Sequence, residues 1–247
     1  MVPKDLQTIF AGATASQRQE RTSASLLKTA ERGTDLKTLT PATPASVQKW
    51  LRCLKDRKNE AGRPLANTKQ YEAVAVVAER VMQELRASAE ASAPVGEPLR
   101  WCLHGGPGTG KSHVIKLVKE LFATVLHWDM GVEFQVVALQ AVMAEQLGGD
   151  TIHHACGIPV NRRGEGNEEQ VQKQQDIAKR VLQWRWLIID EISMASAKLL
   201  ATVDVKLRDA IRRIGTEKLD EEDVDRPFGG TPYHDTLAVV SFARDRQ

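Results

Sequence analysis

The stretch that decides the fold of this chain is Gly105-Gly106-Pro107-Gly108-Thr109-Gly110-Lys111-Ser112. It has the spacing G-x-x-x-x-G-K-S, in which the glycines let the backbone turn tightly and direct several N–H groups at one point. Lys111 can reach the β- and γ-phosphate oxygens of a nucleotide, and the Ser112 hydroxyl is placed to hold Mg²⁺. The stretch therefore predicts a binding site for a nucleoside triphosphate.

The residues on either side of this loop predict the strand and helix that such a loop needs. Residues 99–104 form a short apolar-leaning run that can be a buried strand. Residues from His113 onward open a helix, expected to continue through Leu121 to Leu126, and its dipole adds positive potential at the loop. The order of strand, loop and helix supports the prediction.

A second apolar strand, residues 184–189, ends in two carboxylates, Asp190 and Glu191. Ligands of open α/β sheets lie at the carboxyl ends of the strands, so this strand is expected to deliver both acids to the phosphates. Asp190 would anchor the hydration shell of Mg²⁺ opposite Ser112, and Glu191 would orient and deprotonate the attacking water. The pair therefore favours hydrolysis of the nucleotide over transfer of its phosphate to a second substrate.

Periodic apolar positions alternate between helices and strands along the rest of the folded part. Residues 47–54 predict a short helix, Asn67 and Gln70 form a capping box that opens a second, and residues 132–139 predict a buried strand. The expected core positions of the helices are Val47, Trp50, Leu51, Leu54, Val74, Val77, Val81, Leu85, Leu200, Val203, Leu207, Ile211 and Ile214. This order predicts an α/β fold whose parallel sheet is covered by helices on both faces.

Composition limits the possible classes of protein. The 247 residues are 42% hydrophobic, and 34 basic against 32 acidic residues leave a net charge of +2, which gives no electrostatic argument for a polyanionic partner. Three widely spaced cysteines indicate neither a disulfide framework nor a zinc site and favour a reducing compartment. No run of about 18 apolar residues is present, so no membrane span is expected.

Two polar regions are expected to lie outside the core. Residues 1–44 lack a sustained apolar period and end in a linker-like Thr/Pro/Ala segment, so we expect a disordered, solvated tail. Their Ser, Thr, Ala, Arg and Lys content is only weakly similar to that of a transit peptide. Residues 161–176 are expected to form an exposed loop.

Four stretches together resemble the petite-integration-frequency (Pif-type) DNA helicases of superfamily one. They are residues 65–70, similar to the family's Q motif, and residues 105–112, 149–158 and 187–194, with Arg226–Gly230 also typical. The resemblance covers residues 48–230 and implies a RecA-like P-loop NTPase domain at 45–230, the first of the family's two motor domains. Residues 231–247 then form a divergent tail, with Leu237–Val240 as a further strand and Gln247 near the expected γ-phosphate-sensing glutamine.

The resemblance implies further site residues. Gln70 would bind adenine through its amide, which can donate and accept at once, although its capping role explains the residue equally well. The implied nucleotide site comprises Gln70, Gly105, Gly106, Pro107, Gly108, Thr109, Gly110, Lys111, Ser112 and His113, with Lys111, Asp190 and Glu191 catalytic and Ser112 and Asp190 at Mg²⁺.

Contacts to DNA are implied less specifically. Thr151 and His153 lie in the segment that the family places beside single-stranded DNA, and Gln140 can donate to a phosphate, although the Pro, Thr and Gly of the usual motif are missing there. Packing of one imidazole explains His153 and His154 equally well, and adjacent side chains diverge too much for a metal site. Trp184 and Trp186 are interpreted as core residues rather than as base-stacking platforms.

The resemblance implies an ATP-dependent helicase that moves 5′ to 3′ on single-stranded DNA or DNA junctions and serves repair, recombination and telomere maintenance. An intracellular protein is implied, nuclear or alternatively mitochondrial, while the sequence does not indicate an oligomeric state. Because the second motor domain is missing after Gly230, we expect a truncated or frame-altered product that binds Mg-ATP and unwinds weakly or not at all. The alternatives are a nucleotide-dependent binding module for DNA or protein, and a P-loop ATPase of another kind.

Overall fold

The computed structural model describes residues 41–89, 99–159, 176–181, 183–214, 228 and 238–244. Several predictions from sequence lie outside these residues: the tail up to residue 40, the loop at 161–175, most of Arg226–Gly230, and Gln247. Residues 42–247 belong to one compact unit, to which the following description applies. Within its described part, no helix is long and apolar enough to cross a membrane.

Among the described residues, five parallel strands form one sheet in the order β1-β5-β4-β2-β3. The strands are β1 (Arg100–Gly105), β2 (Phe134–Ala138), β3 (Asp150–Thr151), β4 (Trp186–Asp190) and β5 (Ala238–Arg244). The strand expected near Leu237–Val240 is therefore confirmed as β5, which lies between β1 and β4. Because all five strands run in one direction, their carboxyl ends lie at the same edge of the sheet.

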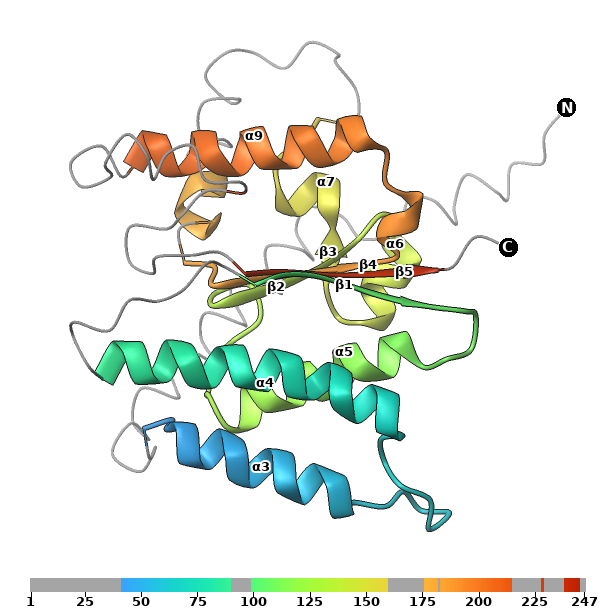
Figure 1. Ribbon diagram of the computed structural model, residues 1–247. Coiled ribbons are helices and arrows are strands. Elements are labelled where there is room, and N and C mark those ends of the chain that lie inside the picture. The colour runs from blue at the N-terminus through green and yellow to red at the C-terminus, as the bar shows by residue number, and fades with distance from the viewer. Residues whose placement is uncertain are drawn as a thin grey trace, which may run out of the picture. The chain divides into compact units, whose positions relative to one another are not determined.

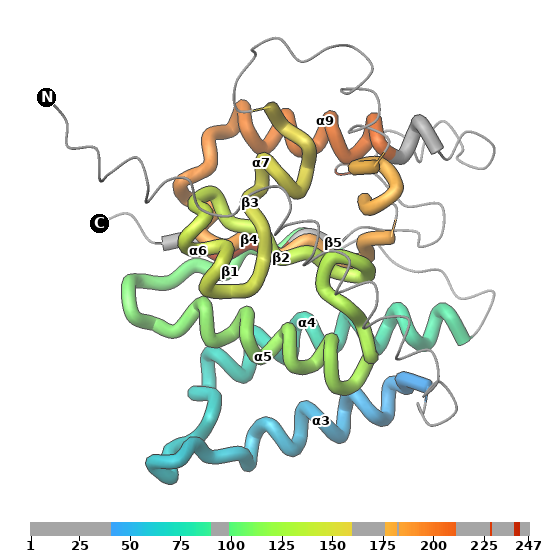
Figure 2. The backbone as a smooth tube through the Cα atoms, turned by 180° about the vertical axis from the view of Figure 1, so that it is seen from behind, coloured from blue at the N-terminus to red at the C-terminus, as the bar shows by residue number. Residues whose placement is uncertain are grey.

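Helices cover both faces of this sheet, as predicted (Figure 1). On one side lie α4 (Thr68–Ala89) and α5 (Lys111–Thr124), with α3 (Pro44–Asp56) packed against α4 as a further layer. On the other side lie α7 (Ile152–Ala155) and α9 (Ala197–Ile214), and α6 (Ala141–Gln146) follows β2. Figure 2 shows the same layers from behind. The α/β architecture with a parallel sheet is thereby confirmed.

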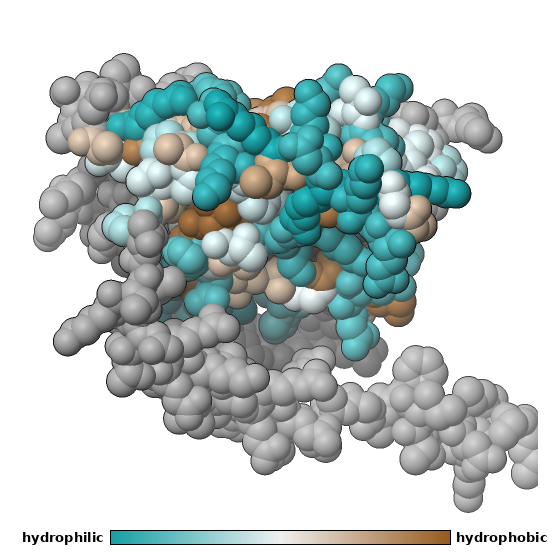
Figure 3. Space-filling view, turned by 90° about the horizontal axis from the view of Figure 1, so that it is seen from below, coloured by the Kyte–Doolittle hydropathy of each residue, from teal (hydrophilic) through white to brown (hydrophobic). Residues whose placement is uncertain are grey.

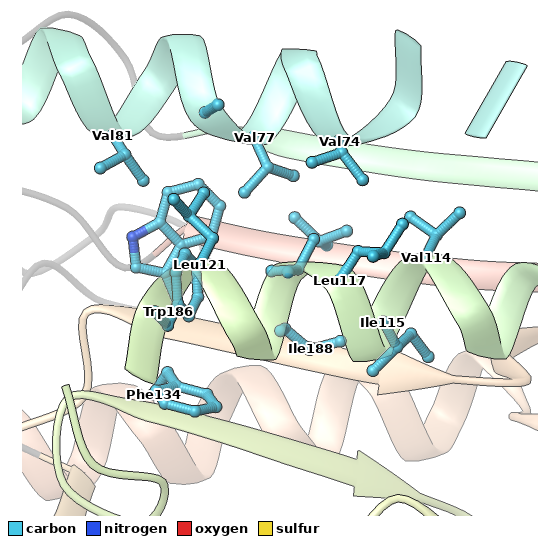
Figure 4. Close-up of a cluster of buried hydrophobic side chains, with 14 of the residues drawn as sticks. Val74, Val77, Val81, Val114, Ile115, Leu117, Leu121, Phe134, Trp186 and Ile188 are labelled. Atoms are coloured by element: carbon cyan, nitrogen blue, oxygen red, sulfur yellow. The ribbon is translucent and has the colours of Figure 1, made fainter. Parts of the chain in front are cut away.

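The larger core cluster fills the space between α4, α5 and the sheet (Figure 4). Val77, Val81 and Leu121 point toward Trp186 of β4, and all four side chains are fully buried. The Phe122 ring lies 5.1–5.3 Å between centroids from Trp128, Phe134 and Trp186. Trp184 is also buried, so packing of both predicted core tryptophans is confirmed.

A second cluster lies between the opposite face of the sheet and α9. Val203 and Leu207 are fully buried there with Leu187 and Ile189 of β4. Phe228 packs on the rim of this cluster. Leu200, a further expected core position of α9, is only half-buried, and the remaining two, Ile211 and Ile214, lie outside the described side chains.

Helix α3 begins at Pro44, in a stretch whose composition predicts a linker. Thr43 is its N-cap and forms a reciprocal capping box with Ser46, because each side-chain oxygen accepts from the other residue's backbone N–H. The predicted buried positions Val47 and Leu54 face α4. The face seen from the α3 side is mostly hydrophilic, consistent with an amphipathic outer helix (Figure 3).

The prediction that β1 is a buried strand is wrong. Arg100, Cys102 and His104 are exposed, while Trp101 and Leu103 are half-buried against the larger cluster. The strand occupies one end of the strand order, and within the described residues only its face toward α4 and α5 is covered. A strand with one covered face alternates between buried and exposed side chains, and β1 follows that pattern.

A buried group of charges, absent from the sequence predictions, joins α4 to the start of β4. The Glu84 carboxylate accepts from Arg80 Nε at 3.2 Å and lies 3.6 Å from a terminal nitrogen of Arg185. The Arg185 guanidinium also lies 4.8 Å from the Trp128 ring centroid. Burial raises the pKa of Glu84 above its usual value, against the opposing pull of Arg185 and Arg80.

The three cysteines are free thiols. Cys53 and Cys102 are exposed, whereas Cys156, the C-cap residue of α7, is buried. Burial raises the pKa of Cys156 to about 12, so its reactive thiolate form is scarce near neutral pH.

Candidate nucleotide-binding site

The loop between β1 and α5 has the backbone geometry that its glycines predict. Gly108 and Gly110 have φ values of 74° and 83°, in the left-handed region that favours glycine. Gly110 is the N-cap of α5, and the Thr109 hydroxyl donates to the Gly106 carbonyl at 2.9 Å. The predicted succession of strand, loop and helix is confirmed. The backbone N–H groups of the first turn of α5 lie beside this loop.

The Lys111 ammonium lies within the loop. Its Nζ donates to the carbonyl oxygens of Gly105 at 2.6 Å and Gly106 at 2.9 Å, so the side chain folds back over the end of β1. An ammonium group has three donors, and these two bonds leave one for another acceptor. The adjacent Ser112 is exposed on the first turn of α5.

Asp190 and Glu191 lie at the same edge of the sheet as the loop. In the register, Ile189 of β4 is level with Ser241 of β5, which is level with Cys102 of β1. Neighbouring strands are about 4.8 Å apart, which places β4 about 10 Å from β1 with β5 between them. Asp190, which ends β4, and Glu191, which follows it, are buried at 6% and 5% exposure, so two buried acidic residues lie at the edge that carries the loop.

Glu191 has an unusual backbone conformation for its residue type. Its φ is 56° and its ψ 47°, in the left-handed region, and such non-glycine residues cluster at functional sites. Its carboxylate accepts from the Ser193 hydroxyl. The chain turns directly after Asp190. The side chains of Asp190 and Glu191 therefore do not simply point to opposite faces of the sheet, as those of adjacent residues in a continued strand would.

Gln70 contacts both its own helix start and the loop. Its Oε1 accepts from Asn67 N at 3.0 Å and the Asn67 side chain accepts from Gln70 N at 2.9 Å, which confirms the predicted capping box. Its Nε2 donates to the Thr109 carbonyl at 3.1 Å. An amide has four hydrogen-bonding positions, so these contacts leave capacity for another partner, and the adenine contact stays a prediction.

His113 is grouped with the loop in the sequence predictions, but its ring is directed elsewhere. Its Nε2 lies 2.8 Å from the Leu65 carbonyl oxygen, in the segment that leads into α4. A carbonyl can only accept, so Nε2 is the donor. The His113 ring therefore contacts the segment that leads into α4, and its place among the nucleotide-binding residues stays a prediction.

The residues predicted to contact DNA follow the neighbouring strands at the same edge. Gln140 is exposed at the N-cap position of α6, two residues after the end of β2, without a side-chain capping bond, and Thr151 ends β3 level with Ala138 of β2. The Thr151 hydroxyl accepts from the His154 backbone N–H at 3.3 Å and so caps α7. His153 is half-buried, which is compatible both with packing of its imidazole and with contact to DNA.

Asp150 is a partner for His154 that the sequence analysis did not identify. Its carboxylate accepts from the Thr151 N–H at 2.7 Å and contacts His154 Nδ1. Burial raises the pKa of Asp150, but the hydrogen bond and charge of His154 and the Thr151 N–H outweigh it, so the net pKa is lowered. No helical spacing predicts this pair, because Asp150 lies in β3 and His154 in α7. Among the described residues no three His, Cys, Asp or Glu side chains gather to hold a metal.

Asp150→Asn is expected to destabilise the fold by about 0.2–1 kcal/mol at neutral pH, because the pair with His154 is half-exposed. A lowered folded-state pKa makes this contribution present above the ordinary pKa near 3.8 and lost as the pH falls through the folded value. Urea unfolding of both proteins at pH 5, 4 and 3 should show the difference shrinking as the pH falls. A difference that grew over this range would contradict this role.

Comparison with known proteins places these observations in a family. Residues 75–233 match the PIF1-like helicase family. The chain is 31% identical over 130 residues to the ATP-dependent DNA helicase RRM3 of Saccharomyces cerevisiae, covering 51% of this chain and 16% of that protein. It is 33% identical over 127 residues to the ATP-dependent DNA helicase PIF3 of Trypanosoma brucei brucei, covering 51% and 13%.

Solved structures of the same kind are also similar. A Bacteroides Pif1 bound to single-stranded DNA is 26% identical, with a TM-score of 0.40 over 60% of this chain and 29% of that one. The Pif1 helicase of Candida albicans is 22% identical, with a TM-score of 0.46 over 72% and 32%. The chain thus spans about a sixth or less of the length of the curated relatives named above. The family match includes the loop, Asp190 and Glu191 and extends over more than half of the sequence, so the chain belongs to the PIF1-like helicase family.

Proposed function

We propose that this chain binds Mg-ATP and hydrolyses it as the first motor domain of an ATP-dependent DNA helicase. The observation that carries the proposal is that a glycine-rich loop, an ammonium group and two buried acidic residues lie at the carboxyl edge of one parallel sheet. That edge is where ligands of open α/β sheets bind. The names of the two curated relatives, both ATP-dependent DNA helicases, support the same activity.

In this proposal the loop N–H groups and the start of α5 hold the β- and γ-phosphates. The Lys111 ammonium exchanges its bonds to Gly105 and Gly106 for phosphate oxygens and stabilises charge on the transferred group. Gln70 contributes its remaining amide positions to adenine. Because the amide already donates to Thr109, the base would lie beside the loop.

Ser112 and Asp190 fit Mg²⁺, since both offer the oxygen donors that this ion prefers and the nucleotide supplies further oxygens. Bound Mg²⁺ would neutralise charge on the phosphates. Glu191 would take the proton of the attacking water, a role that suits a buried carboxylate directly after the Mg²⁺ ligand.

Single-stranded DNA is the proposed second partner. Gln140, Thr151 and His153 follow β2 and β3 at the edge that carries the nucleotide site, so one surface could contact both ligands. From the family we also propose unwinding in the 5′ to 3′ direction and binding of DNA junctions. The same proposal includes roles in repair, recombination and telomere maintenance, and action in the nucleus or mitochondrion.

ATP turnover with and without single-stranded DNA, for the wild type and Lys111→Ala, tests the proposal. We expect DNA-stimulated turnover that falls at least about 100-fold in the variant, because one preorganised charge on the transition state is lost. Tight, Lys111-dependent ATP binding without turnover would instead favour a nucleotide-dependent binding module. Binding and turnover that were both independent of Lys111 would contradict the whole assignment.

A further inference from the structure

Helix α5 holds the loop before α4 at two points. His113 and Glu120 are seven residues apart, two helical turns, and therefore lie on one face of α5. The Glu120 carboxylate accepts from both terminal nitrogens of Arg57, one of them at 3.3 Å, and His113 Nε2 lies 2.8 Å from the Leu65 carbonyl. These two contacts are made to the first and the last residue of the loop 57–65.

The loop between these anchors is closed on itself. Leu65 N donates to the Arg57 carbonyl at 2.8 Å, and Lys58 pairs with Pro64 in an antiparallel bridge. Asn59 further accepts from Arg63 N through its side chain at 3.0 Å. The loop is thus a small unit that α5 holds in place at both of its ends.

The chain that leaves this unit runs directly back to the phosphate loop. Asn67, which lies two residues after Leu65, forms the capping box of α4 with Gln70. Gln70 Nε2 in turn donates to the Thr109 carbonyl at 3.1 Å. A closed circuit of contacts results, from His113 on α5 to Leu65, along the chain to Gln70, and through Thr109 back to α5.

We propose that His113 is a positioning residue that fixes segment 65–70 beside the phosphate loop and so determines the preference of the site for an adenine nucleotide over a bare triphosphate. This inference rests on the proposed function, in which Gln70 contacts adenine. His113 acts through Leu65 and Gln70 and does not itself touch the nucleotide. In the proposed function the phosphates contact the loop and Lys111, whereas adenine contacts Gln70, so a shift of segment 65–70 is expected to weaken binding of adenine more than binding of the phosphates.

The chemistry of the contact explains why histidine suits this position. The Leu65 carbonyl is half-buried and needs a donor at the end of a side chain of medium length. Alanine at position 113 removes that donor. The bond from the Gln70 side chain to Thr109 then still connects segment 65–70 to the phosphate loop. Glutamine reaches a similar distance and keeps an N–H donor, so His113→Gln should restore the contact in part.

The test compares Mg-ATP with Mg-tripolyphosphate as ligands in calorimetric titrations of the full chain. For His113→Ala we expect about 5- to 10-fold weaker binding of ATP, the size of one lost hydrogen bond, with unchanged binding of tripolyphosphate. His113→Gln should recover most of the ATP affinity. Lys116→Ala, an exposed change on the same helix, is the matched control and should behave as the wild type.

The outcomes separate this inference from the function on which it rests. If the wild type bound neither ligand in a Lys111-dependent manner, the proposed function itself would fail. If the wild type bound both ligands and His113→Ala weakened both equally, or weakened neither, the positioning role would be overturned while the nucleotide site stood. Failure of His113→Gln to improve on His113→Ala would likewise overturn the assigned hydrogen bond.

Discussion

Replacing Glu191 by glutamine is expected to lower ATP turnover by about 10²- to 10⁴-fold, the usual contribution of a positioned general base. Glutamine has the same shape as glutamate and can still accept from the Ser193 hydroxyl, but it cannot take a proton from water. Both residues meet the same steric cost at a φ of 56°, so the backbone turn after Asp190 should persist. ATP affinity should therefore change little.

Single-turnover kinetics with labelled ATP, together with equilibrium binding of ATP, would measure the two quantities separately. Glu145→Gln, the same change at an exposed position of α6, is the matched control and should leave turnover unchanged. Turnover by Glu191→Gln close to that of the wild type would show that another group is the base. Equal losses of binding and turnover would instead show that the substitution disturbs the site as a whole.

Glu84→Ala is expected to destabilise the fold by about 3–5 kcal/mol, because it leaves buried arginine charge without its carboxylate. The Arg80 and Arg185 side chains, both largely buried, contact Glu84, and their desolvation is compensated in part by this one group. For a domain of this size each 1 kcal/mol corresponds to roughly 2–4 °C in Tm. The effect should therefore be evident in thermal and urea unfolding.

Glu79→Ala is the matched control on the same helix, since Glu79 pairs with Arg86 at the surface, 3.5 Å apart with both side chains more than half exposed. That change should cost at most about 1 kcal/mol. A similar loss of stability in both variants would contradict the role assigned to the buried group. Burial raises the folded-state pKa of Glu84, so ionising this carboxyl costs more in the folded chain than in the unfolded one, and the wild-type stability falls as the pH rises from the ordinary value of 4.5 through the folded value.

The phosphate loop and the capping box were predictable from sequence because their geometry is local. The spacing of Gly105–Ser112 determines a loop and helix start within eight residues, and Asn67 and Gln70 satisfy each other's backbone N–H groups three positions apart. Asp190 and Glu191 were predictable for a related reason, since a buried apolar strand must end at the carboxyl edge of a parallel sheet.

What the sequence did not predict depends on contacts between distant segments. The position of β5 between β1 and β4 determines the separation of the loop from Asp190, and no local pattern encodes that order. His113 contacts Leu65 48 residues away, and Glu84 meets Arg185 across about a hundred residues. The exposure of β1 likewise reflects its place in the strand order rather than its composition.

Calorimetric titration of Mg-ATP into the wild type, Lys111→Ala and Asp190→Ala tests the central claim most directly. If the loop and the end of β4 share one nucleotide, the wild type binds one ATP per chain with higher affinity in Mg²⁺ than in EDTA. Lys111→Ala then binds at least about tenfold more weakly, as loss of a charge-assisted hydrogen bond implies, and Asp190→Ala loses the advantage conferred by Mg²⁺. Unchanged, Mg²⁺-independent binding in both variants would contradict the account.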